Sequence, residues 1–436
     1  MKTKDDHKRK VSVITLGCSK NLVDSENIIT QLRFNDWNAE HEPDEPAPVV
    51  IINTCGFIQS AKEESIDTII RYAKAKSAGL VEKLFVTGCL SQRYRDELAK
   101  EIPEVDAWFG TLELPELLHR FRADYRHELI GERQITTPKH YAYLKIAEGC
   151  SRTCAFCAIP LMRGSHRSRS IESLVEEARH LASIGVKELI LISQELTYYG
   201  VDRYGKRRLP DLIDQLTEVE GIEWIRLHYT YPGRFPLELL DTMARHEKVC
   251  NYLDIPLQHI SDAVLKTMQR RHTADDIRRV LDAARARVPH IAIRTTFLVG
   301  FPGETEADFL QLLSFVREQE FERVGVFTYS HEEGTAAFRL TDDVPAGVKA
   351  DRANRLMEVQ RTISERKNEA MAGRVFKVLI DRKEGDFFVG RTEYDSPEVD
   401  NEVWIPAHHY LRIGDFANIR ITDYTEYDLY GEPVAN

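Results

Sequence analysis

The sequence predicts a protein of the α/β class in three parts. These are an amino-terminal parallel α/β sandwich, a central partial (β/α)6 barrel of the TIM type, and a small all-β barrel at the carboxyl end. Up to residue 371, short apolar runs rich in β-branched residues alternate with helical patterns, which is typical of parallel strands buried on both faces. After Phe376 only short strands separated by turns remain. A chain of 436 residues is also too long for one ordinary core.

The amino-terminal domain, residues 1–120, contains three strand-like runs, VSVITLGC, VVIINTC and KLFVTGC. Each run ends in a cysteine: Cys18, Cys55 and Cys89. Because the carboxyl ends of parallel strands meet at one edge of a sheet, we expect these cysteines to lie close together. Taken singly, each would more often be a buried core thiol. Residues 121–140 are expected to be a linker that fixes the relation of the first two domains.

The central domain, residues 141–371, contains six strand-like runs separated by helical patterns. The runs are YAYLKIAEGC, ELILISQE, WIRLHYTYP, NYLDIPLQH, IAIRTTFLVGFPG and RVGVFTYS. Six strand–helix units are too few for a closed eightfold barrel, so an open, partial barrel is predicted. A helix over 348–371 should close this domain. The last domain, residues 372–436, should form its small barrel from FKVLID, FFVGRTEYD, NEVWIP and FANIRITDY.

Composition narrows the class of protein. The amino terminus has no apolar secretory segment, and the sequence has no apolar run long enough to span a membrane, so a cytoplasmic location is expected. There, clustered cysteines indicate metal ligands or catalysts rather than disulfides. The net charge of −11 argues against a protein that binds nucleic acid with its whole surface.

Three cysteines, Cys150, Cys154 and Cys157, follow the first strand of the central domain in EGCSRTCAFCAIPLMRGSHRSR. A zinc site would need a fourth ligand, and His166 is the candidate, although the usual spacings of zinc ligands are absent. Unrelated reduced thiols are a second reading. The third is a [4Fe–4S] cluster with three thiolate ligands, which leaves one iron open for another ligand.

The spacing C-x3-C-x-aromatic-C, with Phe156 as the aromatic residue, resembles the signature of radical S-adenosylmethionine enzymes. The resemblance implies that S-adenosylmethionine binds the open iron and is cleaved to a 5′-deoxyadenosyl radical. The segment LVGFPGE is similar to the superfamily's glycine-containing segment beside the adenine, which implies cofactor contacts from Leu298, Gly300, Gly303 and Glu304. A tight turn that opens a helix explains the same residues and is compatible with that role.

The amino-terminal motifs LGCSKNLVDSE, NTCGFIQSAKEESID and TGCLSQRY resemble the methylthiotransferases, a branch of the same superfamily. The last domain resembles a TRAM domain, so the likeness covers nearly the whole chain. It implies a second [4Fe–4S] cluster on Cys18, Cys55 and Cys89, which holds the sulfur that becomes the transferred methylthio group.

Within this branch, GCSKNLVDSE is most similar to the enzymes that modify ribosomal protein S12 at the β-carbon of an aspartate. The resemblance implies S12 as partner and a reductant such as a flavodoxin or ferredoxin. Modification of a tRNA adenosine is the alternative, and an electron-transfer or scaffold protein with two clusters is a more remote one. A protein that only transfers electrons needs neither a barrel cavity nor a glycine-rich fifth strand. Both features therefore argue against the electron-transfer alternative.

Several residues carry weaker signals. Cys250 belongs to neither triplet and is expected in the core. The basic run Arg163, His166, Arg167 and Arg169 is either a solvated surface or an anion site for the cofactor or an acidic substrate. His259 ends the fourth barrel strand and receives no catalytic role. The segment 192–202, ISQELTYYGVD, has an uncertain part in cofactor binding.

The segment from Phe376 onward contains 13 Asp and Glu against 6 Lys and Arg. An RNA-binding module should be basic, so the sequence predicts a basic protein partner and argues against direct tRNA binding. Asp395, Glu398, Asp400 and Glu402 are the predicted docking surface, with a merely solubilising surface as the alternative.

Overall fold

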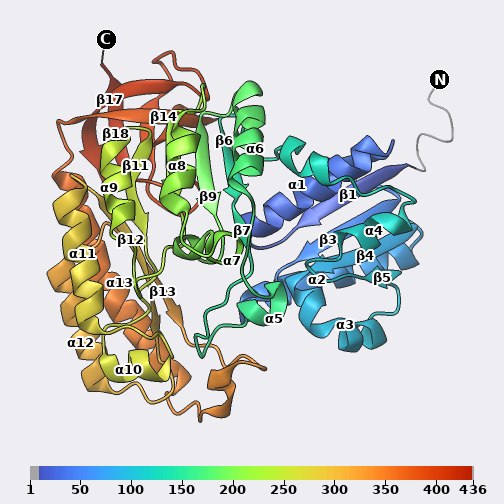
Figure 1. The fold of residues 1–436 in the computed structure, drawn as a ribbon, viewed down its shortest axis with the longest axis horizontal. Coiled ribbons are helices and arrows are strands. Elements are labelled where there is room, and N and C mark those ends of the chain that lie inside the picture. Colours follow the sequence, from blue (N-terminus) through green and yellow to red (C-terminus); the bar gives the residue numbers. More distant parts are fainter. Residues whose placement is uncertain (1–8, 435–436) are drawn as a thin grey trace.

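A computed structural model describes residues 9–434, which form three domains in chain order (Figure 1). The first contains a five-stranded parallel sheet in the order β2-β1-β3-β4-β5. Its strands are β1 (Lys10–Thr15), β2 (Asn38–His41), β3 (Val49–Thr54), β4 (Lys83–Gly88) and β5 (Ala107–Trp108). Helices α1 (Ser19–Phe34) and α4 (Leu114–Arg120) cover one face, and α2 (Gln59–Ser77) and α3 (Cys89–Glu101) the other. The predicted sandwich is therefore confirmed.

The central domain is an open sheet of six parallel strands in the order β13-β12-β11-β10-β9-β6. The strands are β6 (Tyr141–Lys145), β9 (Glu188–Ile192), β10 (Trp224–Leu227), β11 (Val249–Asp254), β12 (Ala292–Val299) and β13 (Arg323–Thr328). They coincide with the six predicted runs, and the partial barrel is confirmed. A short hairpin of β7 (Ala147–Glu148) and β8 (Arg167–Ser168) brackets the cysteine loop.

Helices surround the outer face of this sheet and bury its apolar side chains in one large core (Figure 1). They are α6 (Ile171–Ser183), α8 (Leu209–Thr217), α9 (Glu238–Arg245), α11 (Ala274–Arg287), α12 (Glu306–Gln319) and α13 (Ala346–Glu369). The shorter helices α5 (Ile159–Arg163), α7 (Val201–Tyr204) and α10 (Asp262–Thr267) lie in the connections. Three 3-10 turns, at His127–Glu132, Leu196–Tyr198 and Ala336–Arg339, complete them. In the part of the chain that the structure describes, no helix is both long and apolar enough to cross a membrane.

The last domain is a closed barrel in the order β14-β15-β16-β18-β17. Its strands are β14 (Val375–Glu384), β15 (Phe387–Thr392), β16 (Val403–Pro406), β17 (Phe416–Tyr424) and β18 (Leu429–Pro433). The first four were predicted. The fifth, β18, was not, because LYGEP contains glycine and proline and alternates poorly.

The acidic segment between β15 and β16 faces the central domain rather than solvent, which contradicts the predicted docking surface. Asp395 accepts a hydrogen bond from Arg323 Nε at 3.1 Å. Asp400 accepts hydrogen bonds from Tyr252 Oη at 2.7 Å and Arg294 Nε at 3.2 Å. Arginines on the barrel strands thus neutralise charges that sequence composition counted as surface charge.

The remaining two predicted docking residues behave differently from each other. Glu402 pairs with Arg382 of its own domain, at 2.5 and 2.9 Å. Of the four residues only Glu398 is exposed, and its one described hydrogen bond, from Tyr141 Oη, is long at 3.4 Å. The last domain is therefore attached to the central one by buried ion pairs, and its acidic composition partly reflects that attachment.

Candidate functional site

The first cysteine triplet lies at the carboxyl edge of the amino-terminal sheet, as the sequence predicted. Cys18 is the residue before α1, Cys55 follows β3 directly, and Cys89 opens α3 after β4. Since β1, β3 and β4 are neighbours in the sheet, their ends bring the three thiols together. Gly17 has φ +94°, and a Cβ there would lie 2.8 Å from the Cys55 sulfur. Only glycine allows the first loop to approach the second so closely.

Burial keeps the Cys55 and Cys89 thiols protonated in the absence of a metal. It raises the pKa of Cys55, and it raises the pKa of Cys89 to about 12 although the charge of Arg163 acts in the opposite direction. Cys18 is exposed. A metal that replaces the thiol protons would offset the cost of burying thiolates, so the donor set fits an iron–sulfur cluster.

The second triplet lies in the loop that follows β6 and β7. The loop is closed by a hydrogen bond from the Cys150 amide to the Gly164 carbonyl at 3.0 Å. Gly149 has φ +75°, and a Cβ there would lie 2.2 Å from the Ser165 carbonyl oxygen. Burial raises the pKa of Cys150 to about 11 and that of Cys157 to about 12.

A cation supports this second triplet from the other side of the barrel mouth. The guanidinium of Arg270, which is buried, lies 3.4 Å from the Cys154 sulfur and donates its other nitrogen to the Pro256 carbonyl at 2.6 Å. A positive group beside a thiolate favours metal binding. No sequence motif points to Arg270, because it lies outside both cysteine motifs.

The geometry does not suit a single zinc ion. Among the residues that the structure describes, no three His, Cys, Asp or Glu side chains converge as ligands of one metal ion. His166, the proposed fourth zinc ligand, instead contacts the Ser168 hydroxyl at 3.1 Å. A cluster differs from zinc in that each thiolate binds its own iron, so the sulfurs stay apart.

A cavity of about 210 Å³ adjoins the second triplet at the carboxyl edge of the barrel. Arg152 and Glu195 form an ion pair at 2.8 Å in its wall. Tyr198 and Tyr231 also line it, and the Arg152 guanidinium lies over the Tyr231 ring at 4.2 Å. Glu195 and Tyr198 belong to the segment 192–202, whose role the sequence left uncertain. Their position after β9, where barrel enzymes place active-site groups, was the available signal.

The segment Leu298–Glu304 forms the tight turn that the sequence indicated. The Glu304 carboxylate accepts a hydrogen bond from the Gly300 amide at 2.7 Å and an ion pair from Arg352 at 2.9 Å. Burial raises the pKa of Glu304 to about 7, opposed by Arg352. A Cβ on Gly300 would lie 2.3 Å from Lys349 Cγ, so the turn needs glycine where it packs on α13. The described contacts of Glu304 are thus with the turn, with α13 and with buried His259, whose Nε2 lies 3.8 Å from the carboxylate.

Phe156 and Leu298 meet in a small apolar cluster behind the second triplet, which also contains Phe301 and Tyr329. The ring centroids of Phe156 and Phe301 are 6.4 Å apart. Gly303 has open space where a side chain would be. The cofactor contacts expected of these residues therefore remain a proposal, and their packing positions them beside the cluster loop.

Two of the weaker predictions, for Cys250 and His259, have clear outcomes. Cys250 is buried among Trp224, Tyr252 and Leu379, so its core role is confirmed. His259 is fully buried, and its Nδ1 accepts a hydrogen bond from the Ser261 amide at 2.9 Å. Burial lowers the pKa of His259 to about 3, as for a packed polar residue.

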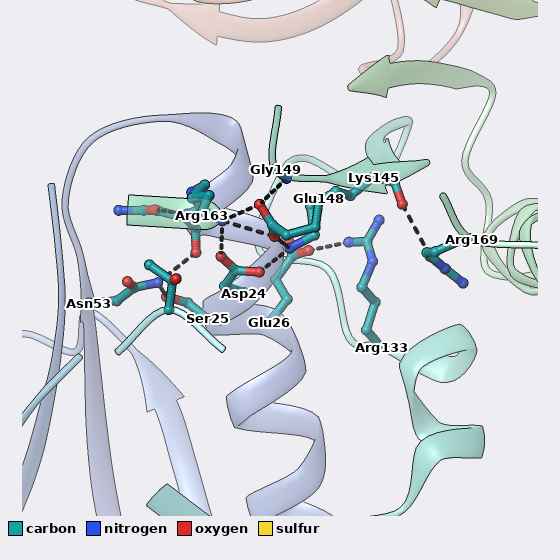
Figure 2. Close-up of polar contacts among 12 residues, drawn as sticks. Asp24, Ser25, Glu26, Asn53, Arg133, Lys145, Glu148, Gly149, Arg163 and Arg169 are labelled. Carbon is teal, nitrogen blue, oxygen red and sulfur yellow. Dashed lines mark hydrogen bonds and ion pairs between the residues drawn. The ribbon is translucent and has the colours of Figure 1, made fainter. Parts of the chain in front are cut away.

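The basic run has a role that the sequence did not suggest (Figure 2). Arg163 is buried and pairs with Asp24 of α1 at 2.9 Å and with Glu148 at 3.0 Å. Arg169 pairs with Glu177, and only Arg167 is exposed. For Arg163 and Arg169, the predictions of a solvated surface and of an anion site are therefore both wrong, because each arginine already pairs with a carboxylate of the chain.

The linker adds a second joint between the first two domains. Arg133 is buried between Glu26 of α1 and Glu177 of α6, and it donates to the Tyr143 carbonyl. Figure 2 shows its ion pair with Glu26. Lys145, at the end of β6, also pairs with Asp24. A third joint lies on α2 and α3, where Lys62 and Arg93 both bind Glu332.

One short helix connects the two triplets directly. Helix α5 begins two residues after Cys157, and its residues Ile159 and Met162 pack with Ala158 against Cys89 of the other domain. The two carboxyl edges therefore face each other across α5 and the ion pairs of Arg163.

Family models match all three domains. Residues 10–110 match the Uncharacterized protein family UPF0004, residues 144–316 match the Radical SAM superfamily, and residues 372–434 match the TRAM domain. Among solved structures, the chain is similar to the radical S-adenosylmethionine methyltransferase TsrM from Kitasatospora setae (TM-score 0.55, 13% identity, 73% of this chain and 72% of that chain). It is also similar to the cobalamin-dependent S-adenosylmethionine radical enzyme OxsB (TM-score 0.53, 12% identity, 81% and 57%). At such identities these structures show the fold alone.

Sequence relatives are much more similar. The ribosomal protein uS12 methylthiotransferase RimO of Flavobacterium johnsoniae is 59% identical over 99% of this chain and 100% of its own length. The RimO of Christiangramia forsetii is 58% identical over 100% and 96%, and that of Bacteroides thetaiotaomicron is 50% identical over 98% of each. The full-length identity and the three matched domains agree with the two facing triplets, and the chain belongs to the RimO family of ribosomal protein uS12 methylthiotransferases within the radical SAM superfamily.

Proposed function

We propose that this chain transfers a methylthio group to the β-carbon of an aspartate side chain of ribosomal protein S12. The observation that carries the proposal is the pair of cysteine triplets that face each other across α5, with Met162 of that helix on Cys89. Transfer between two centres requires that the substrate reach both, and full-length relatives that carry this activity in their names are 50–59% identical.

Each triplet would hold one [4Fe–4S] cluster: Cys150, Cys154 and Cys157 the first, and Cys18, Cys55 and Cys89 the second. When bound, the first cluster with S-adenosylmethionine supplies hydrogen abstraction from the substrate carbon, and the second supplies the methylthio group that takes the hydrogen's place.

The chain's own residues position and shield these groups. The cavity beside Cys150 is lined by Arg152, Glu195 and Tyr231, which can bind polar groups of a cofactor at the barrel mouth. Phe156 and Leu298 close the apolar side of the cluster loop, and Gly300 and Gly303 keep the turn before α12 compact. The joints at Arg163 and Arg133 hold the distance between the two domains.

The choice of S12 over tRNA now depends on the relatives and not on charge. The buried pairs of Asp395 and Asp400 with arginines mean that the acidic composition of the last domain is weaker evidence for a basic partner than the sequence indicated. We still propose a protein substrate, no direct binding of tRNA, a cytoplasmic location, and a flavodoxin or ferredoxin as electron donor.

The test compares isolated S12 and isolated tRNA as substrates of the anaerobically reconstituted enzyme with S-adenosylmethionine and a reductant. Mass spectrometry should find one added methylthio group on an aspartate of S12 and none on tRNA. Modification of tRNA with none of S12 would contradict the proposal.

A further inference from the structure

A buried lysine lies where the two domains meet and has no carboxylate partner among the residues that the structure describes. Lys20 is the second residue of α1, two residues after Cys18, and is only 7% exposed. Its ammonium lies 3.2 Å from the ring centroid of Tyr229, in the loop that follows β10 at the carboxyl edge of the central sheet. The charge of Lys20 therefore lies between the auxiliary cysteines and the mouth of the barrel.

The rest of α1 fixes this position. Two and three residues further along, Leu22 and Val23 pack against Tyr143 and Ile190 of the central sheet. Asp24 then pairs with Lys145 at the end of β6. Because α1 is held over the ends of β6 and β9, Lys20 at its start is directed toward the loop that follows the neighbouring strand β10.

Other buried cations show how unusual Lys20 is. Among the described residues, every other buried lysine or arginine pairs with a carboxylate except Arg270, which contacts the Cys154 sulfur. The paired ones are Arg133, Arg163, Arg226, Arg323, Lys349, Arg352 and Arg391. Burying an ammonium without a counter-ion is unfavourable, and an aromatic face compensates only in part. An anion bound beside Lys20 would therefore stabilise its ammonium.

The proposed reaction supplies such an anion. The target is an aspartate side chain, whose carboxylate is bonded to the β-carbon that receives the methylthio group. A cation that binds this carboxylate also fixes the position of the reacting carbon one bond away.

We propose that Lys20 binds the carboxylate of the substrate aspartate and so positions its β-carbon between the two triplets. This inference rests on the proposed function. Lys20 is then a specificity-determining residue, because a substrate with an uncharged side chain in place of the aspartate would leave the Lys20 ammonium unpaired.

The test is a cycle of substitutions in both partners. Binding of S12, and of S12 with the target aspartate replaced by asparagine, is measured with the anaerobic holoenzyme and with the Lys20→Met, Lys20→Arg and Lys62→Met variants. Wild-type enzyme should bind the aspartate form about tenfold or more tightly than the asparagine form, as for a charge-assisted hydrogen bond. Lys20→Met should bring that ratio close to one, and Lys20→Arg should keep most of it.

Lys62→Met is the matched control, since it removes a lysine from another domain joint, and its ratio should equal that of the wild type. Iron content verifies that each variant is intact, and Lys20→Gln replaces Lys20→Met if the latter loses iron. An equal loss of affinity for both forms of S12, or no loss, would overturn the inference and assign Lys20 a structural role. So would weaker binding of S-adenosylmethionine with an unchanged ratio, which would assign Lys20 to the cofactor. Failure of the wild type to modify S12 would instead refute the proposed function.

Discussion

Replacing Arg163 with methionine should loosen the joint between the first two domains. Arg163 is buried, pairs with Asp24 and Glu148, and donates to the Asn21 side chain. Without it, Lys145 alone faces two carboxylates. Breaking a buried ion pair by removing one partner costs about 3–5 kcal/mol. The side chains of Asp24 and Glu148 are 22% and 15% exposed, so water can partly solvate them, and the lower end of that range is expected.

Hydrogen–deuterium exchange measured by mass spectrometry can detect this change locally. A loss of about 3 kcal/mol in the free energy of opening corresponds to about 100-fold faster exchange of the amides that open with the joint. We expect it in peptides that cover α1 and β6, while β17 in the last domain should be unaffected.

Arg167→Met is the matched control, because Arg167 lies four residues away and is exposed. It should exchange like the wild type. If Arg163→Met changed the exchange of α1 by less than about threefold with iron content unchanged, the joint would not depend on this ion pair and the reasoning would be wrong.

Three further predictions concern the two clusters, the protonation of Glu304 and the attachment of the last domain. Replacing Cys150, Cys154 and Cys157 together by alanine should leave about half the iron, measured on anaerobic protein. Cys18→Ala should keep 5′-deoxyadenosine formation while it abolishes methylthio transfer. Complete loss of iron from the folded triple variant, or transfer by Cys18→Ala, would contradict the two-cluster assignment. The pKa of Glu304 is raised from 4.5 to about 7, so the folded state binds the extra proton and loses stability as pH rises from about 4.5 to 7, by as much as about 3 kcal/mol. Relative to Glu304→Gln, the free energy of unfolding of the wild type should fall over this window, and a constant difference would show that folding does not raise the pKa of this carboxyl group. Asp400→Ala should destabilise the attachment of the last domain by about 3 kcal/mol in urea unfolding, because it leaves Arg294 with Asp254 alone, whereas the exposed Glu398→Ala should change it little.

The sequence sufficed for elements whose pattern is continuous and local. All six barrel strands are apolar runs, and the carboxyl ends of β1, β3 and β4 could be aligned because each ends near a cysteine. The strands β2 and β18 were missed because NAEH and LYGEP carry no run of β-branched or aromatic residues, and neighbouring strands impose their conformation. Tertiary pairing overrides a weak local preference in both.

Charge was the least reliable guide. Asp400 and Arg294 are 106 residues apart, and nothing in either local sequence indicates that they meet. A count of charges in residues 376–436 treats each one as exposed, whereas the structure pairs Asp395 and Asp400 with the barrel. Composition reports the sum of charges, but burial decides which of them a partner can contact.

Arg163 links the loop of the second triplet to the amino-terminal domain, and so helps to fix the relative position of the two triplets that methylthio transfer requires. The six residues that follow Cys157, 158–163, supply both the contact of Met162 with Cys89 and the ion pair of Arg163 with Asp24. Any shift of the cluster loop would therefore also move its contact with the auxiliary triplet, and any loosening of α1 would move both Cys18 and Lys20. Because a misplacement of about 1 Å can cost two orders of magnitude in rate, a transfer between two separate centres needs such a shared support more than a single-centre reaction does. A loop that binds one cluster and contacts the ligand set of the other gives that support without a further domain.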